Sequence, residues 1–307
     1  MNTRVRTASI ALVGAALLSL GLAGCSGSAE ASASSTADGT FAIDSDTLVY
    51  GVVPDSASTQ TNYQPLMDYI AQETGKKVEY HESTDYAALI EAAVAGKIDV
   101  ASFSGFTYVT ATKNGAQISP VSSVITKKGQ KPGYYSEAIV PVGSSIADIA
   151  GFAGKKVCFV DPSSTSGYLF PSYNLLKAGI DPEKGVTPVF AGKHDVSVQK
   201  VGEGVECEAG FAEDSEVAKS DKVKVVDKTM VPGAPIVVSD TLPADVQQKL
   251  RDILSEVTVD DIVASGVKSA DSDGFRSVFY ATSPVDDSYY DVIRDICTKV
   301  NAKQCQG

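Results

Sequence analysis

The sequence predicts an α/β protein of two lobes, each with a mostly parallel sheet flanked by helices, and three observations support this. Strand-like apolar runs alternate with amphipathic helical segments from Leu48 onward. The same rhythm begins again near Ser144. Two extended segments, "YYSEAIVPV" and "APIVVSDTL", separate the two series, so the chain should enter lobe one, cross to lobe two and return. Alternation of strand and helix is typical of parallel sheets covered by helices.

The first series contains three strand–helix pairs. Strands are predicted at "LVYGVVP", "KVEYHES" and "IDVASFS". Helices are predicted to follow them over residues 63–74, 86–95 and 105–115, and Gly75 and Gly96 mark two of the helix ends. This βαβαβ order predicts a sheet whose strands share one carboxyl edge.

The second series predicts strands at "KKVCFV", "TPVFAG", "CEAGFAED" and "KVKVVDK", with helices over 168–178 and 194–201. Two more helices, 244–265 and 286–300, follow the return crossing. We therefore assign 46–138 and 235–307 to lobe one and 139–234 to lobe two. Two lobes joined by two crossings form a cleft that closes by hinge motion. Ligands of open α/β sheets bind outside the carboxyl ends of the strands, which here face the cleft.

The N-terminal segment has the anatomy of a secretory signal. Arg4 and Arg6 precede an apolar run that ends in Leu22-Ala23-Gly24-Cys25, which resembles the bacterial lipobox. This pattern predicts a signal peptide over 1–24, cleavage after Gly24, and lipid on Cys25. Residues 25–45 are rich in Ser, Ala and Gly, which is typical of a flexible tether. The expected location is extracytoplasmic, with a lipid anchor in the cell membrane; a plain secretory signal with an incidental cysteine is the alternative.

The charge balance excludes several partners. The full chain carries a net charge of −12, and removal of the signal loses two arginines and no acidic residue. Nucleic acid requires a basic surface, so it is excluded as a partner. The same negative charge opposes binding to anionic lipid, which leaves Cys25 as the expected membrane contact. We expect a monomer.

Four cysteines remain after the predicted lipidation site. An even number in an oxidising compartment indicates disulfides. Spacing favours Cys297 with Cys305 and Cys158 with Cys207, although four cysteines permit three connectivities. Zinc is the alternative, but it needs clustered Cys and His ligands, and His81 and His194 are the only histidines. No metal and no cofactor are predicted.

The segment "DPSSTSGYLFP" is the sharpest local signal for a binding site. A strand ends there, a turn rich in hydroxyls follows, and a helix begins. Ser164, Thr165 and Ser166 would offer neutral hydroxyl donors next to unpaired N–H groups at a helix start, where the helix dipole favours negative charge. Gly167 would let a ligand approach the main chain. A small oxyanion fits such a site; on pattern alone, an ordinary helix N-cap explains the segment equally well.

Other candidates follow the remaining strands. His194 opens the helix after "VFAGK" and could donate a hydrogen bond, more strongly if protonated. Asp214 ends "CEAGFAED" and could accept from an acidic O–H group or an amine of the ligand. Each could instead be a solvated surface residue. Lobe one contributes hydroxyl and aromatic candidates at its strand ends, which could equally serve as packing: Ser58, Thr59, Tyr86, Phe103 and Ser104.

At this point the chain resembles a known family, the phosphonate-, phosphite- and phosphate-binding proteins of ABC importers, which have the type II periplasmic-binding fold. Four segments carry the resemblance in matching order and spacing: "DYAALIEAAVAGKIDVASFSG", "DPSSTSGYLFPSY", "GKHDVSVQKVGEGVECEAGFAEDS" and "VPGAPIVV". The resemblance implies that Ser164–Ser166 bind the P–O oxygens, with His194 as a further donor. It also implies a cleft aromatic at Phe103 and an acidic contact at Asp214.

One position departs from the family pattern. Relatives that bind aminophosphonates carry an acid at x of "P-G-x-P", and this chain has Ala234 there. The loss of that carboxylate favours phosphate, phosphite or a small alkylphosphonate, although Asp214 keeps an amine possible. The resemblance therefore implies a receptor that captures a small phosphorus oxyanion and delivers it to the transmembrane subunits of a permease.

Two other function classes were weighed against this interpretation. A secreted hydrolase of phosphate or phosphonate esters would need a base or Lewis acid, yet the two S-x-x-K matches at Ser197 and Ser265 lack their companion motifs. There is also no G-x-S-x-G motif in the sequence. We therefore predict that the chain is not an enzyme. A lipoprotein sensor module is the other alternative.

Overall fold

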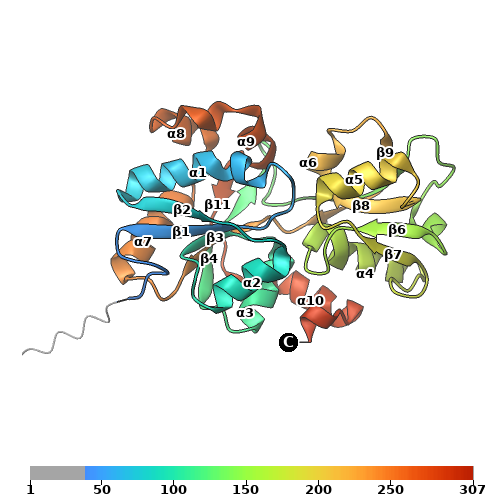
Figure 1. Ribbon diagram of the computed structural model, residues 1–307, viewed down its shortest axis with the longest axis horizontal. Coiled ribbons are helices and arrows are strands. Elements are labelled where there is room, and N and C mark those ends of the chain that lie inside the picture. The colour runs from blue at the N-terminus through green and yellow to red at the C-terminus, as the bar shows by residue number, and fades with distance from the viewer. Residues whose placement is uncertain (1–38, 307) are drawn as a thin grey trace, which may run out of the picture. The chain divides into compact units, whose positions relative to one another are not determined.

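The computed structural model describes residues 39–306. The predicted signal peptide, the lipidation site Cys25 and most of the predicted tether lie outside the described residues. Figure 1 shows the elements. The strands are β1 Thr47–Val52, β2 Lys77–His81, β3 Val100–Ser102, β4 Ile118–Ile125, β5 Tyr134–Pro141, β6 Lys156–Phe159, β7 Thr187–Phe190, β8 Ala209–Glu213, β9 Val223–Val231, β10 Pro235–Ser239 and β11 Ala281–Ser283. The α-helices are α1 Thr59–Thr74, α2 Tyr86–Val94, α3 Gly105–Lys113, α4 Phe170–Lys177, α5 His194–Glu203, α6 Asp214–Val217, α7 Ala244–Leu254, α8 Val259–Ala264, α9 Asp273–Val278 and α10 Asp291–Val300.

The first sheet has the strand order β11-β4-β10-β3-β1-β2. Side chains of a strand point alternately to its two faces, and β1 shows this clearly. Leu48 and Tyr50 belong to the apolar cluster that contains residues of α1 and α7, whereas Val49 belongs to the cluster of α2 and α3. Figure 1 shows α1 on one face of this sheet and α2 and α3 on the other. Both faces are therefore covered, which explains why β1 is buried along its whole length.

The second sheet has the strand order β7-β6-β8-β5-β9. Its faces are also separate cores. Phe159 packs in the larger apolar cluster with residues of α4, and Cys158 packs in a small cluster with residues of α5. The larger cluster also contains Phe106 and Ile293 from the part of the chain that carries the first sheet. A continuous apolar core therefore connects elements of the two sheets.

The α/β class is confirmed, but both sheets are mixed rather than mostly parallel. β1 pairs in parallel with β2 and β3, and β6 pairs in parallel with β7 and β8. By contrast, β10 runs antiparallel to β3 and β4, and β5 runs antiparallel to β8 and β9. A parallel neighbour requires a long crossover connection. β5 and β10 arrive directly from the other sheet without a helix, so they join their new sheet in the antiparallel sense.

Further elements differ from the prediction, and α6 and α9 are among those that it lacks. β4 was missed because Ser119, Pro120, Ser122 and Ser123 interrupt the apolar pattern of its sequence. The helix predicted over 244–265 is two helices, α7 and α8. α8 begins with a capping box in which the side chains of Thr258 and Asp261 each accept a backbone N–H of the other residue. The short strand β11 was also missed.

The sheets also locate the two crossings. β4 ends at Ile125 in the first sheet and β5 begins at Tyr134 in the second. The return runs from Val231, at the end of β9, to Pro235, at the start of β10. "YYSEAIVPV" and "APIVVSDTL" therefore contain full sheet strands, and the crossings are the short segments before them. The lobe limits at 138 and 235 stay a prediction; the pairing of β5 favours an earlier first limit.

The predicted cysteine pairs are present. Cys158 and Cys207 form one disulfide with 5.6 Å between their Cα atoms, and Cys297 and Cys305 form the other with 5.5 Å. Among residues 39–306, no group of three or more Cys, His, Asp or Glu side chains could hold a metal ion. No helix in this part of the chain is long and apolar enough to cross a membrane.

Candidate functional site

The segment after β6 places three hydroxyl side chains at the carboxyl end of a central strand. Ser164, Thr165 and Ser166 are all buried, and the residues from Thr165 to Leu169 form a π-helical turn that leads into α4. A helix therefore does begin at the predicted position, with a wider first turn. Gly167 is required for a steric reason, because a Cβ there would lie 2.3 Å from Cβ of Val160, and its expected role in admitting a ligand stays a prediction.

Two of the three hydroxyls already accept a backbone hydrogen bond. Ser164 Oγ accepts from Gly167 N at 3.0 Å, and Thr165 Oγ1 accepts from Phe106 N at 2.8 Å. A hydroxyl that accepts an N–H keeps its own hydrogen free to donate. The buried phenol of Tyr86 lies near Ser164, outside hydrogen-bonding geometry. Ser164 and Thr165 are therefore oriented as donors by the main chain.

Ser166 differs from its two neighbours. Its carbonyl accepts a hydrogen bond from Ser136 Oγ at 2.6 Å, but its hydroxyl is buried with no hydrogen-bond partner among the described residues. The phenol of Tyr134 lies near this hydroxyl, outside hydrogen-bonding geometry. A buried polar atom without a partner is rare, and commonly marks a place where a ligand or water binds.

His194 begins α5 and is buried, with 2% of its surface exposed. Its Nδ1 accepts a hydrogen bond from the backbone N of Glu213 at 2.9 Å, so the neutral ring carries its hydrogen on Nε2. Burial lowers the pKa of His194 to about 4, against the opposing effect of Asp55. The ring is therefore a neutral donor at physiological pH, and its protonated form is not needed.

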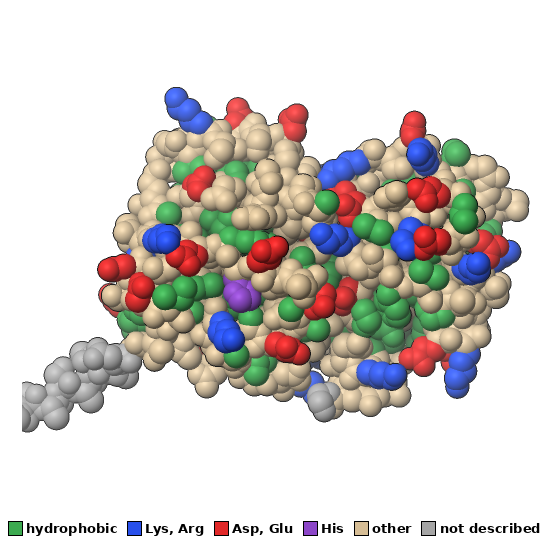
Figure 2. All heavy atoms as spheres, in the orientation of Figure 1, with side chains coloured by type: hydrophobic (Ala, Val, Ile, Leu, Met, Phe, Trp, Pro, Cys, Tyr) green, Lys and Arg blue, Asp and Glu red, His purple; other side chains and the backbone are tan. Residues whose placement is uncertain are grey.

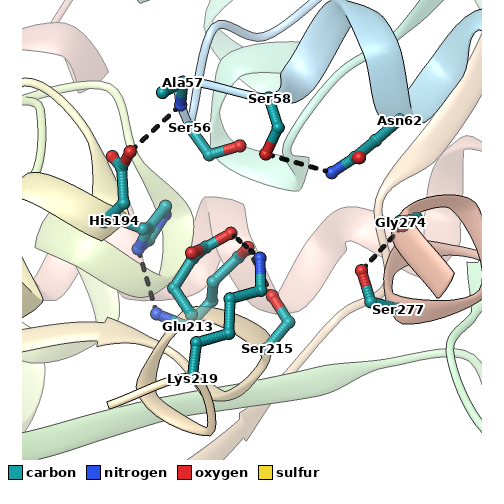
Figure 3. A network of polar contacts seen from close by, with 12 residues as sticks. Ser56, Ala57, Ser58, Asn62, His194, Glu213, Ser215, Lys219, Gly274 and Ser277 are labelled. Atoms are coloured by element: carbon teal, nitrogen blue, oxygen red, sulfur yellow. Dashed lines mark hydrogen bonds and ion pairs between the residues drawn. The ribbon is translucent and has the colours of Figure 1, made fainter.

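The structure has a cavity of about 300 Å³, and Ser164, Thr165, Ser166 and His194 are not among the residues that line it. Three predicted residues line it, namely Phe103, Ser104 and Asp214, together with Ala234. Tyr134 also lines the cavity, and its phenol lies near the hydroxyl of Ser166. Figure 3 shows His194, Glu213 and the serines of the loop after β1 from close by.

Several predicted residues already have protein partners. Asp214 accepts from the backbone N of Tyr135 at 3.2 Å and pairs with Lys127 at 3.3 Å. Ser104 caps α3 by accepting from Thr107 N. In Figure 3, Ser58 accepts a long hydrogen bond from Asn62, and Ser58 is exposed. Thr59 donates to Asp55 Oδ1 at 2.7 Å. These contacts explain the positions of these side chains without a ligand.

Two carboxyl residues of the cavity were missed in the sequence. Asp55 follows β1 and Glu213 ends β8, and both line the cavity. Burial, with repulsion from Glu213, raises the pKa of Asp55 to about 7, and burial raises the pKa of Glu213 to about 7. Their positions at strand carboxyl ends were the available signal. Of the adjacent residues that the sequence analysis predicts, Ser58 is exposed and Asp214 lines the cavity beside Glu213, and polarity alone does not distinguish these outcomes.

Loops that follow strands of the first sheet contact loops of the second directly. The backbone N of His194 donates to the carbonyl of Asp55 at 2.8 Å, and Ala57 N donates to Asp195 Oδ2 at 3.1 Å. The bond from Phe106 N to Thr165 is another such contact. The hydroxyl segment, His194 and the carboxyl residues are therefore assembled from both parts of the chain.

Solved structures with similar folds agree with this architecture. A binding protein component of an ABC phosphonate transporter from Pseudomonas aeruginosa has a TM-score of 0.71 at 22% identity, covering 84% of this chain and 87% of that one. PhnD1 from Prochlorococcus marinus, solved in complex with methylphosphonate, has a TM-score of 0.69 at 17% identity, covering 84% and 99%. These likenesses confirm the predicted two-lobed periplasmic-binding fold.

The sequence comparisons identify the family. Residues 50–282 match the family described as ABC transporter, phosphonate, periplasmic substrate-binding protein. A Mycolicibacterium smegmatis protein named phosphate-import protein PhnD is 34% identical over 322 residues, which covers 95% of this chain and 96% of that protein. These are binding and import proteins, so the hydrolase interpretation is wrong and the prediction of a non-enzymatic chain is confirmed. The chain belongs to the phosphonate-binding family of periplasmic substrate-binding proteins of ABC transporters.

Proposed function

We propose that this protein captures a small phosphorus oxyanion, namely a phosphonate, phosphite or phosphate, and delivers it to the transmembrane subunits of an ABC permease. Ser164, Thr165, Ser166 and the Nε2 hydrogen of His194 are the proposed donors to the phosphoryl oxygens. The name of the Mycolicibacterium smegmatis relative and the methylphosphonate in the Prochlorococcus marinus structure support this ligand class.

The observation that carries the proposal is that the buried hydroxyl of Ser166 has no hydrogen-bond partner among the described residues. The neighbouring hydroxyls of Ser164 and Thr165 each accept a backbone N–H and keep their own hydrogen free to donate. An unpaired buried polar group costs about 1–3 kcal/mol. A phosphoryl oxygen that accepts from Ser166 would remove that cost. Neutral donors suit the recognition of an anion inside a protein, because they need no counter-charge in the cavity.

Charge supports local recognition rather than long-range attraction. Figure 2 shows acidic and basic side chains interspersed over the visible face. The cations that line the cavity are Lys127 and Arg276, and each is paired with protein carboxylates, Lys127 with Asp214 and Arg276 with Asp260 and Asp271. The net charge of −12 opposes the approach of an anion. Affinity would therefore come from fixed, desolvated hydrogen bonds.

The test is thermal denaturation with phosphate, phosphite, methylphosphonate and 2-aminoethylphosphonate, since only a ligand of the native state raises the melting temperature. We expect at least one of them to stabilise the protein, and the variant Ser166→Ala to lose most of that gain. Ser172→Ala is the matched control, because Ser172 is a second buried serine whose hydroxyl has no partner, on α4 outside the proposed site. Equal ligand stabilisation in both variants would refute the role of Ser166.

The lipid anchor is part of the same proposal. The sequence "LAGC" supports lipidation of Cys25, which would hold the receptor near its permease. Replacement Cys25→Ala is expected to release the protein into the medium. Membrane retention of this variant, measured by fractionation, would show that another feature anchors the chain.

A further inference from the structure

We propose that Asp55 and Glu213 form a carboxyl pair that accepts a hydrogen bond from a P–OH group, so that the site selects proton-bearing phosphorus oxyanions over fully ionised ones such as sulfate. The inference rests on the proposed function and adds a specificity determinant to it. It concerns residues outside the hydroxyl segment.

The geometry leaves one oxygen of each carboxyl available. Asp55 Oδ1 accepts from Thr59 Oγ1 at 2.7 Å, and Glu213 Oε1 accepts from Ser215 Oγ at 2.7 Å. Among residues 39–306, Asp55 Oδ2 and Glu213 Oε2 make no hydrogen bond or ion pair. Both residues line the same cavity. The cavity therefore contains acceptor oxygens that the protein itself does not satisfy.

The two carboxyls flank His194. The carbonyl of Asp55 accepts from the backbone N of His194 at 2.8 Å, and the backbone N of Glu213 donates to its ring. Tyr86, which lies near Ser164, and Tyr134, which lies near Ser166, are both influenced electrostatically by Asp55 and Glu213. The pair is therefore at the end of the site where the phosphoryl group would be bound.

No nearby cation neutralises the pair within the described residues. Lys219 is bound to Glu216 at 2.6 Å, and Lys127 is bound to Asp214. The other charged groups that influence the two carboxyls or His194 electrostatically are the carboxylates of Glu216, Asp214 and Asp195 and the ammonium of Lys219, and His194 itself is neutral. Burial, with repulsion from Glu213, raises the pKa of Asp55 to about 7, and burial raises the pKa of Glu213 to about 7, so the pair is ionised above about pH 7.

The charge of the pair determines whether a ligand with a P–OH group is favoured over one without a proton. Above about pH 7, an oxyanion without a proton would place its own negative oxygen against a carboxylate, which is repulsive in a buried site. A P–OH group supplies the missing donor, while the remaining oxygens accept from the hydroxyl segment. An amine is less favoured, because Asp214, the residue expected to meet it, is already bound to Lys127 and Tyr135.

The experiment is calorimetric titration of the mature protein with phosphate, methylphosphonate, sulfate and 2-aminoethylphosphonate between about pH 5 and pH 9. The variants are Asp55→Asn and Glu213→Gln. The matched control is Glu137→Gln, a half-buried carboxyl of β5 with a raised pKa that does not line the cavity. Melting temperatures establish that each variant folds.

We expect the wild type and the control to prefer phosphate over sulfate by about tenfold or more, and each cavity variant to reduce that ratio by about tenfold. An unchanged ratio in both cavity variants, with phosphate still bound, would overturn the carboxyl pair and leave the proposed function intact. A selective loss of 2-aminoethylphosphonate binding in these variants would also overturn it, since the pair would then hold an amine. If the wild type binds none of the phosphorus compounds, the proposed function itself fails.

Discussion

The hydroxyl segment Ser164–Ser166 and the carboxyl pair of Asp55 and Glu213 occupy equivalent positions, at the carboxyl ends of strands, but offer opposite chemistry. The hydroxyl segment presents neutral donors that the main chain orients. The pair presents acceptor oxygens whose charge changes near neutral pH. A tetrahedral oxyanion has acceptor oxygens and, in some species, one acidic hydrogen. The comparison suggests that the two regions recognise these two features separately.

The largest expected effect comes from Thr165, because its hydroxyl serves both the ligand and the protein. Thr165→Val removes a proposed donor and leaves the buried N–H of Phe106 without its acceptor. We expect affinity for phosphorus oxyanions to fall by about a hundredfold or more, and unfolding free energy to fall by about 1–3 kcal/mol. Calorimetry and thermal denaturation measure the two effects. Thr165→Ser, which keeps the hydroxyl, should restore most of both.

This variant also sharpens the contrast with Ser166, whose hydroxyl no protein group uses. Ser166→Ala should weaken binding without a loss of unfolding free energy. If Thr165→Val bound the ligand as tightly as the wild type, the hydroxyl segment would be an ordinary helix start and not a binding site.

The second prediction concerns how the contributions of His194 and of the carboxyl pair to stability depend on pH. For His194, the folded pKa of about 4 lies below the unfolded value, so its contribution to stability is lost as pH falls from about 6.5 toward 4. For Asp55 and Glu213, the folded pKa of about 7 lies above the unfolded value, so stability rises as pH falls from about 7 toward 4. The two carboxyls together outweigh the histidine in the wild type.

The double variant Asp55→Asn with Glu213→Gln should therefore change the pH profile. As pH falls from about 7 toward 4, the unfolding free energy of the double variant should rise less than that of the wild type. The difference between the two proteins should grow by about 1.4 kcal/mol or more for each pH unit in this range. Denaturant unfolding of the ligand-free proteins at several pH values measures this. Parallel profiles of the two proteins would show that the carboxyls titrate normally and that the contrast between the regions is wrong.

The sequence was sufficient for the features that local chemistry determines. The alternation of apolar strands and helices predicted the α/β class. The sequence alone also placed the hydroxyl-rich turn after β6 at the end of a strand. The direction of β5 and β10 could not be predicted, because it depends on which sheet each strand joins after a crossing. Asp55 and Glu213 could not be predicted for a related reason: several polar residues stand together at these strand ends, and only the fold determines which of them line the cavity.

The smallest expected effect concerns Ala234, which lines the same cavity as Asp214. Asp214 is not free to meet an amine substituent of the ligand, because it is bound to Lys127 and Tyr135. Ala234→Asp would supply a free carboxylate, and we expect the affinity ratio of 2-aminoethylphosphonate to methylphosphonate to rise by about tenfold. Ala234→Asn is the matched control, since it has similar shape and no charge. Measured by competitive calorimetry, an equal ratio in the two variants would mean that the substituent does not reach this wall. In that case the cavity beyond the carboxyl pair would not discriminate among ligands, and specificity would reside in the phosphoryl group alone.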